Sequence, residues 1–326
     1  MSQFVNMDEV AVALPLKKAH YPFPRVEKLR ATLKSRLTDY FTYTSIGAPF
    51  EAKGVLVTGN SRVGKSHELR RVISELNEDA LIMPSGLPAR IVSCKLPGRM
   101  TWKDLGIIAL QALEYPCEGR NRTQAYIWST VHQQAKRQGV VGIYFDECQH
   151  MFTDTGNAAN RIVLDQFKSI MKDERWPLMV IMSGVPTLAK HIESDIEKEE
   201  RKQLKLLLSP VHFEMINPEK DFDELNTLCY SYADKAGVSF DKISSADFYE
   251  RLSFACSFRW GLVIELLIEA LTKCVLAGQK RISMKHFDRA FSVIYGTAEG
   301  FSPFSLDDYE EAFNPDKLLE FISSDT

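Results

Sequence analysis

Residues 59–66 form a glycine-rich segment with the residue types and spacing that bind nucleotide phosphates. The segment reads Gly-Asn-Ser-Arg-Val-Gly-Lys-Ser and fits the pattern G-x-x-x-x-G-K-[ST]. It lies between an apolar run and a helical pattern, so its backbone N–H groups are expected to surround the β-phosphate at a helix N-terminus. Lys65 is expected to contact the β- and γ-phosphate oxygens, and the Ser66 hydroxyl to bind Mg²⁺. The candidate nucleotide-binding residues are Gly59, Asn60, Ser61, Arg62, Val63, Gly64, Lys65, Ser66 and His67.

Two carboxylates, Asp146 and Glu147, follow the apolar run at 140–145. Hydrolysis of a nucleoside triphosphate needs an Asp to hold Mg²⁺ and a second group to activate water, and this pair can supply both. Acidic residues are also common where a strand runs into a helix N-terminus. Because the pair follows a phosphate-binding segment, the sequence favours the catalytic interpretation. Asp146 would then join Ser66 around Mg²⁺, and Glu147 would polarise the attacking water.

Ser183 ends the next apolar run, at 178–183. In a parallel sheet of this type, the C-terminal edge of that strand is expected beside the strand that carries Asp146. Ser183 is therefore a candidate to contact the γ-phosphate or the attacking water. The alternative is an ordinary turn residue at a strand end.

The elements that position these residues alternate along the chain. Five apolar runs separated by helical patterns indicate a parallel β-sheet covered by helices on both faces. After Pro218 only helical patterns remain, which predicts a second, all-helical domain of about 80 residues. The predicted strands are at 54–57, 90–94, 140–145, 178–183 and 211–215. The predicted C-terminal helices are at 222–236, 245–256, 260–275 and 284–294, the last with Ser283 as its N-cap.

The two ends of the chain differ in charge. Residues 17–36 carry seven basic side chains against one acidic one, with apolar residues at helical spacing, and predict a basic amphipathic helix. Residues 299–326 are acidic and aromatic, which suits either a flexible tail that docks on a partner or a solvated terminus. The predicted segments are an N-terminal extension at 1–36, a nucleotide-binding domain at 37–217, a helical lid at 218–298 and a tail at 299–326.

Composition narrows the class of protein. The formal net charge is −3, from 40 basic and 43 acidic residues, so a nucleic-acid surface has to be a local patch. The six cysteines are spread singly, which argues against a zinc site or a disulfide framework and favours a reducing compartment. The sequence predicts neither a signal peptide nor a membrane span. We therefore expect a cytoplasmic protein with no membrane partner.

Together, the phosphate-binding segment, the acidic pair, the polar residue on the next strand and the helical lid resemble the AAA+ ATPases. Within that superfamily the chain is similar to the TnsC/TniB group of transposition regulators, and more distantly to MuB and IstB. The resemblance spans about residues 21–295. Further matching stretches are YPFPRVEKL, KLPGRMTWKDLGIIALQALEYP, FDECQHM, LDQFKSIMKDERWPLMVIMSGVP and SPVHFEMINP. The resemblance implies an α/β fold with a five-stranded parallel sheet in three αβα layers, a helical lid, ATP and Mg²⁺ as cofactors, and ATPase activity.

The resemblance also implies oligomers with ATP between adjacent subunits and an arginine that reaches the neighbour's γ-phosphate. The segment before the fifth strand offers Arg201 for this role, and the simpler interpretation is a solvated helical arginine. Arg259, just before a lid helix, is the candidate for the lid arginine that many AAA+ proteins direct at the phosphates. The TniB pattern at this place is glycine-rich and often lacks an arginine.

Residues 88–138 carry eight basic residues against three acidic ones. In the resembling proteins this region lines the inside of a helical filament around duplex DNA. Repeated subunits would add many weak, sequence-independent contacts into tight and salt-sensitive binding. A basic surface loop without function is the alternative, and the N-terminal basic helix is a second candidate patch. The candidate DNA contacts are Arg99, Thr101, Lys103, Arg120, Arg122 and Thr123.

The resulting hypothesis is an ATP-dependent regulator of DNA transposition that forms a ring or filament on double-stranded DNA. Its expected partners are further copies of itself, a transposase and a target-selection protein, with a CRISPR-associated complex as one open possibility. Two other hypotheses are a helicase loader that acts on single-stranded DNA and a nucleotide-gated DNA-binding scaffold with negligible turnover. A P-loop kinase fits less well, because Glu147 suits water activation.

Overall fold

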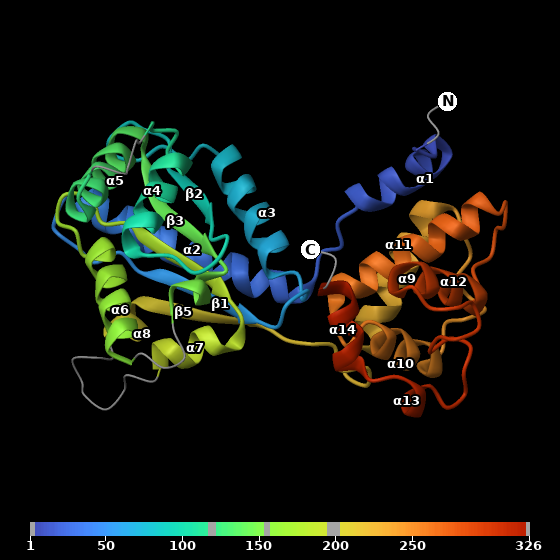
Figure 1. The fold of residues 1–326 in the computed structure, drawn as a ribbon. Coiled ribbons are helices and arrows are strands. Elements are labelled where there is room, and N and C mark those ends of the chain that lie inside the picture. The colour runs from blue at the N-terminus through green and yellow to red at the C-terminus, as the bar shows by residue number, and fades with distance from the viewer. Residues whose placement is uncertain (1–3, 117–121, 153–156, 194–202, 324–326) are drawn as a thin grey trace. The chain divides into compact units, whose positions relative to one another are not determined.

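The computed structural model describes residues 4–116, 122–152, 157–193 and 203–323 (Figure 1). The chain divides into two compact units. One, the sheet unit, is Phe23–Phe213, and the other, the helical unit, combines Met1–Pro22 with Glu214–Thr326. Among the described residues, no helix is both long enough and apolar enough to span a bilayer.

The sheet unit is built on five parallel strands in the order β2-β3-β4-β1-β5, which confirms the predicted α/β fold. Every residue of β1, β3 and β4 is buried, as expected when helices cover both faces of a parallel sheet. The carboxyl ends of β1, β3 and β4 therefore meet at one edge. The strands are β1 (Gly54–Gly59), β2 (Arg90–Lys95), β3 (Val140–Asp146), β4 (Met179–Gly184) and β5 (Leu208–Phe213).

The fifth strand lies earlier in the chain than the apolar pattern predicts. It begins at Leu208 and pairs with β1 from Gly54 opposite Leu208 to Gly59 opposite Phe213. Pro210 breaks the sequence pattern because proline has no N–H for a strand ladder. β5 is an edge strand in the sheet order, so a proline is tolerated there.

Helices connect the strands of the sheet unit. α2 contacts β1 and β5, α3 contacts β1 and β2, and α5 contacts β3. The helices are α2 (Pro24–Ile46), α3 (Lys65–Glu78), α4 (Trp102–Ala112), α5 (Gln124–Gln138), α6 (Asn157–Met171), α7 (Pro186–Glu193) and α8 (Gln203–Leu207), with a short 3₁₀ helix η2 (Cys148–Met151).

The N-terminal basic stretch contains two helices rather than one. α1 (Met7–Lys18) belongs to the helical unit, where the Tyr232 hydroxyl donates to the Ala19 carbonyl at 3.2 Å. α2 starts with Pro24 in its first turn and ends at Gly47, which has φ 74°. The prolines between the helices explain the difference, because proline ends one helix and favours the start of another.

The helical unit confirms the four predicted C-terminal helices within one or two residues. They are α9 (Phe222–Ala236), α10 (Ala246–Ala255), α11 (Trp260–Leu276) and α12 (Met284–Tyr295), followed by α13 (Tyr309–Ala312) and α14 (Pro315–Ser323). Ser283 is the N-cap of α12, as the sequence predicts, and the structure adds a capping box with His286.

The aromatic residues after 299 pack inside this unit, so the expectation of a flexible tail is wrong for the described part. The Phe304 ring lies 5.3 Å from that of Phe287, and the Tyr309 ring 5.0 Å from that of Phe254. Arg251 donates to the carbonyls of Pro303 and Leu306 at 2.8 and 2.7 Å. The bonds from Arg251 satisfy two backbone carbonyls of this segment. The segment is therefore ordered, although its acidic composition resembles that of a disordered tail.

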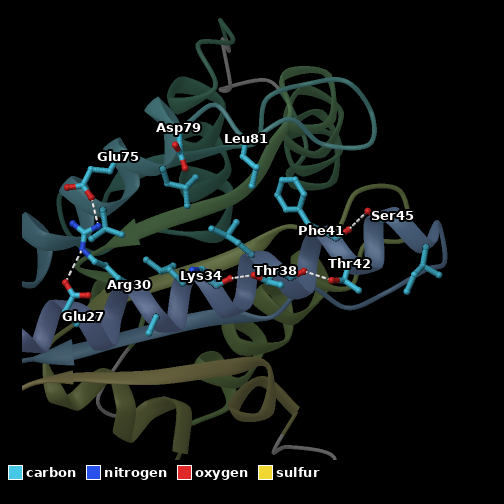
Figure 2. A pocket seen from close by; sticks show the side chains of 16 residues that line it. Glu27, Arg30, Lys34, Thr38, Phe41, Thr42, Ser45, Glu75, Asp79 and Leu81 are labelled. Atoms are coloured by element: carbon cyan, nitrogen blue, oxygen red, sulfur yellow. Dashed lines mark hydrogen bonds and ion pairs between the residues drawn. The ribbon is translucent and has the colours of Figure 1, made fainter.

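A groove of about 1290 Å³ runs between α2 and α3 (Figure 2). At one end Arg30 forms ion pairs with Glu75 at 2.5 Å and Glu27 at 3.8 Å. The hydroxyls of Thr38, Thr42 and Ser45 bond back to carbonyls four residues earlier in α2. None of the residues that line the groove belongs to the phosphate-binding segment, so this hollow is separate from the nucleotide site.

Candidate nucleotide-binding and catalytic site

Residues 60–64 form the loop between β1 and α3, as the sequence predicts. The loop is folded back on itself, and Lys65 Nζ donates to the Asn60 carbonyl at 2.8 Å. Gly64 has φ 96°, a left-handed conformation that glycine adopts without strain. A Cβ atom on Gly59 would lie 2.4 Å from the Phe213 carbonyl oxygen, so the start of the loop requires glycine. The loop thus places Lys65 at the N-terminus of α3, and helix N-termini are places where proteins commonly bind phosphate.

Asp146 is the centre of the site. It ends β3, is 5% exposed and accepts three hydrogen bonds on Oδ1. The donors are Ser66 Oγ at 2.8 Å, Ser183 Oγ at 2.6 Å and the Glu147 N–H at 3.1 Å. The structure therefore brings together Ser66, Asp146 and Ser183, which come from α3, β3 and β4.

Ser183 is fully buried, and the Tyr144 hydroxyl lies 3.0 Å from its Oγ. A serine hydroxyl has one hydrogen, and Ser183 gives it to Asp146. Tyr144 therefore donates to Ser183, and the three residues form a chain of hydrogen bonds that ends at the carboxylate. In this arrangement Ser183 holds Asp146, and its predicted contact with the γ-phosphate or water stays a prediction.

Glu147 follows Asp146 in a left-handed backbone conformation, φ 58° and ψ 42°. This conformation is uncommon for a residue with a Cβ atom, and it occurs often at functional sites. The side chain is half-buried and accepts a hydrogen bond from Gln149 Nε2. The carboxylate thus lies next to Asp146 in the chain but is held by a different partner.

Lys65 is 5% exposed, and its surroundings act on its charge in two directions. Burial lowers the pKa of Lys65, because a buried ammonium loses its hydration, while the charges of Glu147 and Asp146 act to raise it. The net direction is downward. Burial together with the charge of Asp146 raises the pKa of Tyr144, which keeps its hydroxyl as a donor.

The site fits Mg²⁺ bound together with a nucleotide. Mg²⁺ prefers oxygen ligands and is usually bound by one or two carboxylates, waters and substrate phosphates. The Ser66 hydroxyl and the Asp146 carboxylate supply oxygens of the required kind 2.8 Å apart. In the described part of the chain, no group of three or more His, Cys, Asp or Glu is arranged to hold a metal. The protein supplies only part of a coordination shell here, which suits a metal whose other ligands are phosphate oxygens and waters.

The two candidate arginines are placed differently. Arg259 is the N-cap of α11 in the helical unit, is 9% exposed and donates to the Ser257 carbonyl at 2.5 Å. Burial lowers its pKa. Arg201 lies outside the described residues. Contact of either arginine with a nucleotide stays a prediction.

Five of the six candidate DNA contacts lie in the described chain, and two of them cap helices. Thr101 caps α4 and Thr123 caps α5, each accepting from a backbone N–H at 3.2 Å. Arg99 and Arg122 are exposed, and Lys103 in the first turn of α4 is half-buried. Arg120 lies outside the described residues.

A tryptophan pair fixes the relation of α4 to α5. The rings of Trp102 and Trp128 stack at 4.5 Å, and Trp128 Nε1 donates to the Trp102 carbonyl at 3.1 Å. At the other end, Gln138 Nε2 donates to the Leu113 carbonyl at 2.8 Å. The two helices therefore run in the same direction, and their N-termini lie at the same end of the pair.

Several residues that shape these sites are not predicted from the sequence. Tyr144 and Gln149 hold the catalytic candidates, and Trp102 and Trp128 align the two helices. A signal existed for Tyr144, a hydroxyl in an otherwise apolar run, and for Gln149, an amide two residues after the acidic pair. The contact of Gln149 depends on the left-handed turn at Glu147, which the sequence pattern does not define.

Solved structures of similar fold include several ORC proteins. The Aeropyrum pernix ORC1 protein in complex with DNA is 14% identical, with a TM-score of 0.56, and covers 96% of this chain and 86% of its own. The Aeropyrum pernix ORC2 protein in its ADPNP-ADP complexes is 14% identical, with a TM-score of 0.56, covering 86% of this chain and 71% of its own. Drosophila ORC bound to DNA is 12% identical, with a TM-score of 0.54, covering 92% and 69%.

At these identities the structures share a fold with this chain. Comparison with curated proteins gives no match. Residues 50–192 match the family model described as an AAA domain. The matched region contains the phosphate-binding loop, Asp146, Glu147 and Ser183 in the geometry given above. This part of the chain is therefore similar in sequence to an AAA domain, and the sheet unit has an AAA+-like α/β fold.

Proposed function

We propose that the protein is an ATP-hydrolysing regulator of DNA transposition that assembles on double-stranded DNA. The observation that carries the ATPase part is the convergence of Ser66 and Ser183 on one oxygen of Asp146, beside Lys65 and Glu147. Phosphoryl transfer is catalysed mainly by positioning the reactants and stabilising charge, and this arrangement can do both.

In the proposed reaction, Lys65 and the loop N–H groups bind the β- and γ-phosphates and stabilise negative charge as it develops. Mg²⁺, held through Ser66 and Asp146, would neutralise charge on the phosphate oxygens when bound. Glu147 accepts a proton from the attacking water while the water oxygen forms a bond to the γ-phosphorus. The bond from the γ-phosphorus to the bridging oxygen breaks, and ADP leaves with that oxygen.

The DNA-binding part is supported by the paired helix N-termini of α4 and α5. Each terminus carries a partial positive charge from the helix dipole, so two of them at one end favour phosphate. Arg99, Lys103 and Arg122 add full charges around them. Asp104 is the opposing charge there, and its carboxylate is engaged by the N–H and hydroxyl of Thr101. Two of the similar structures are described as DNA complexes.

The transposition part rests on the sequence resemblance to the TnsC/TniB regulators. In this proposal ATP binding joins neighbouring subunits, with Arg201 and Arg259 completing the site, and the assembly links a target-selection protein to the transposase. Hydrolysis through Glu147 releases subunits. Arg99, Thr101, Lys103, Arg120, Arg122 and Thr123 contact the duplex backbone.

The test combines turnover with assembly. Purified protein should release phosphate from ATP in the presence of Mg²⁺, and electron microscopy with duplex DNA and a slowly hydrolysed ATP analogue should show rings or filaments. Glu147→Gln should assemble but not turn over, because it keeps the site's shape and removes the base.

Other outcomes identify the alternatives. A preference for single-stranded over duplex DNA at fixed salt would indicate a helicase loader. Assembly without DNA-stimulated phosphate release would indicate a nucleotide-gated scaffold. Monomers on bare DNA, with ATP present, would refute the proposal.

A further inference from the structure

Gln149 occupies a place between the two catalytic strands that the ATPase proposal does not use. Its side-chain amide bonds in two directions: Nε2 donates to Glu147 Oε2, and Oε1 accepts the Val185 N–H at 3.4 Å. Glu147 follows β3, and Val185 follows β4. The amide therefore bridges the proposed base to the end of the neighbouring strand.

The orientation of the amide is determined by its partners. Turning it over would place Oε1 against a carboxylate oxygen and Nε2 against a backbone N–H, which are two repulsive contacts. An amide is the side-chain group that offers a donor and an acceptor from one planar head. The bridge thus depends on glutamine at this position rather than on polarity alone.

Gly184 provides the space for the bridge. A Cβ atom at Gly184 would lie 2.5 Å from Gln149 Oε1, closer than real contacts allow. The residue before it, Ser183, bonds to Asp146 at 2.6 Å. The three residues that end β4 and follow it therefore hold both acids, Asp146 directly and Glu147 through Gln149.

The bridge engages one of the two carboxylate oxygens of Glu147, Oε2, and so holds the orientation of the group that is proposed to accept the proton of the attacking water. It also fixes a side chain whose backbone is in an uncommon left-handed conformation. We propose that Gln149 is a positioning residue that restrains Glu147 and ties its release to movement of the end of β4. The inference rests on the proposed ATPase function and adds a restraint on its base.

The test uses the full-length protein and the variant Gln149→Met, which keeps the length of the side chain and removes both hydrogen bonds. We expect kcat for ATP hydrolysis without DNA to rise about tenfold to 150-fold, the change that loss of one hydrogen bond to a charged group corresponds to. The Kd for ATP should stay at the wild-type value. A merely structural role would lower turnover, so the direction of the change separates the two.

Three further variants complete the design. Gln133→Met makes the same chemical change at an exposed position of α5 and should match the wild type. Gln149→Asn is one methylene shorter, cannot span both partners and should give an intermediate rise even if Gln149→Met does not fold. Glu147→Gln combined with Gln149→Met should be inactive, because the gain acts through Glu147.

A kcat at or below the wild-type value in Gln149→Met, with ATP binding intact, would overturn the inference while leaving the ATPase proposal in place. Residual raised turnover in the double variant would also overturn it. Absence of Mg²⁺-dependent hydrolysis in the wild type would instead refute the ATPase proposal itself.

Discussion

Ser183 Oγ lies 2.6 Å from Asp146 Oδ1, and the serine hydroxyl is completely buried. The residue at the end of β4 therefore acts on the carboxylate at the end of β3. The Tyr144 hydroxyl in turn donates a hydrogen bond to Ser183 Oγ. The position of the Asp146 carboxylate is thus set by a neighbouring strand and a tyrosine in the sheet.

Ser183→Ala should lower kcat about tenfold or more and weaken the apparent affinity for Mg²⁺, because Asp146 loses a buried donor. Tyr144→Phe is the matched control. It removes the hydroxyl behind Ser183 but leaves the bond to Asp146, so its effect should be smaller. Steady-state rates across a Mg²⁺ titration measure both, and equal losses would contradict a specific role for Ser183.

Lys65→Met should weaken ATP binding about 100-fold, because the buried ammonium is the charge that the loop directs at the phosphates. Titration calorimetry with ATP and Mg²⁺ measures the change. Lys190→Met, which removes an exposed lysine from α7, should bind like the wild type. Unchanged affinity in Lys65→Met would refute phosphate binding at this loop.

Arg122→Ala should weaken duplex binding and reduce the slope of log K against log salt concentration by about 0.9, the value for one lost phosphate contact. The loss should be the same for unrelated DNA sequences, because backbone contacts carry no sequence information. Arg137→Ala is the control, since Arg137 lies in the last turn of the same helix. Fluorescence anisotropy over a range of salt concentrations gives both slopes, and equal slopes for both variants would exclude the helix N-termini as the binding end.

His132 is expected to make stability depend on pH. Burial lowers the pKa of His132 below its ordinary value of 6.5, although Asp173 and the Trp176 carbonyl act in the opposite direction. The unfolded chain therefore binds the proton more readily, so the stabilisation is complete above about pH 6.5 and falls as the pH drops below it.

Thermal unfolding between pH 7.5 and 5.5 tests this expectation. The Tm of the wild type should fall over this range more than that of His132→Asn, which keeps a donor toward the Trp176 carbonyl. A Tm that falls equally in both would assign the pH dependence to other groups.

The sequence predicts which candidate residues lie together, because most of them lie in short-range patterns. The loop at 59–66 and the end of β3 combine a chemical motif with a fully buried strand, and strand order places Ser183 beside them. Gln149 is less predictable, since its role requires the left-handed turn at Glu147 and the absence of a side chain at Gly184. Neither leaves a periodic signal.

The errors in the fold have similar local causes. Pro210 interrupts the apolar pattern, so the first half of β5 is not predicted from the sequence. The boundary between α1 and α2, in the proline-rich segment before α2, is not predicted either. After residue 299, acidic residues dominate the composition, while the packing is decided by Phe304 and Tyr309. Average composition therefore does not predict that a few aromatic side chains of this segment are buried in a core.

The contact between Gly59 and Phe213 has a mechanical consequence. The two residues are paired across β1 and β5, and even one added carbon would collide with the Phe213 oxygen. Glu214, the next residue, already belongs to the helical unit. A force applied to the chain where it passes from β5 to the helical unit would therefore act directly on the strand pair at Gly59, the first residue of the phosphate-binding segment, because no residue separates Phe213 from that unit.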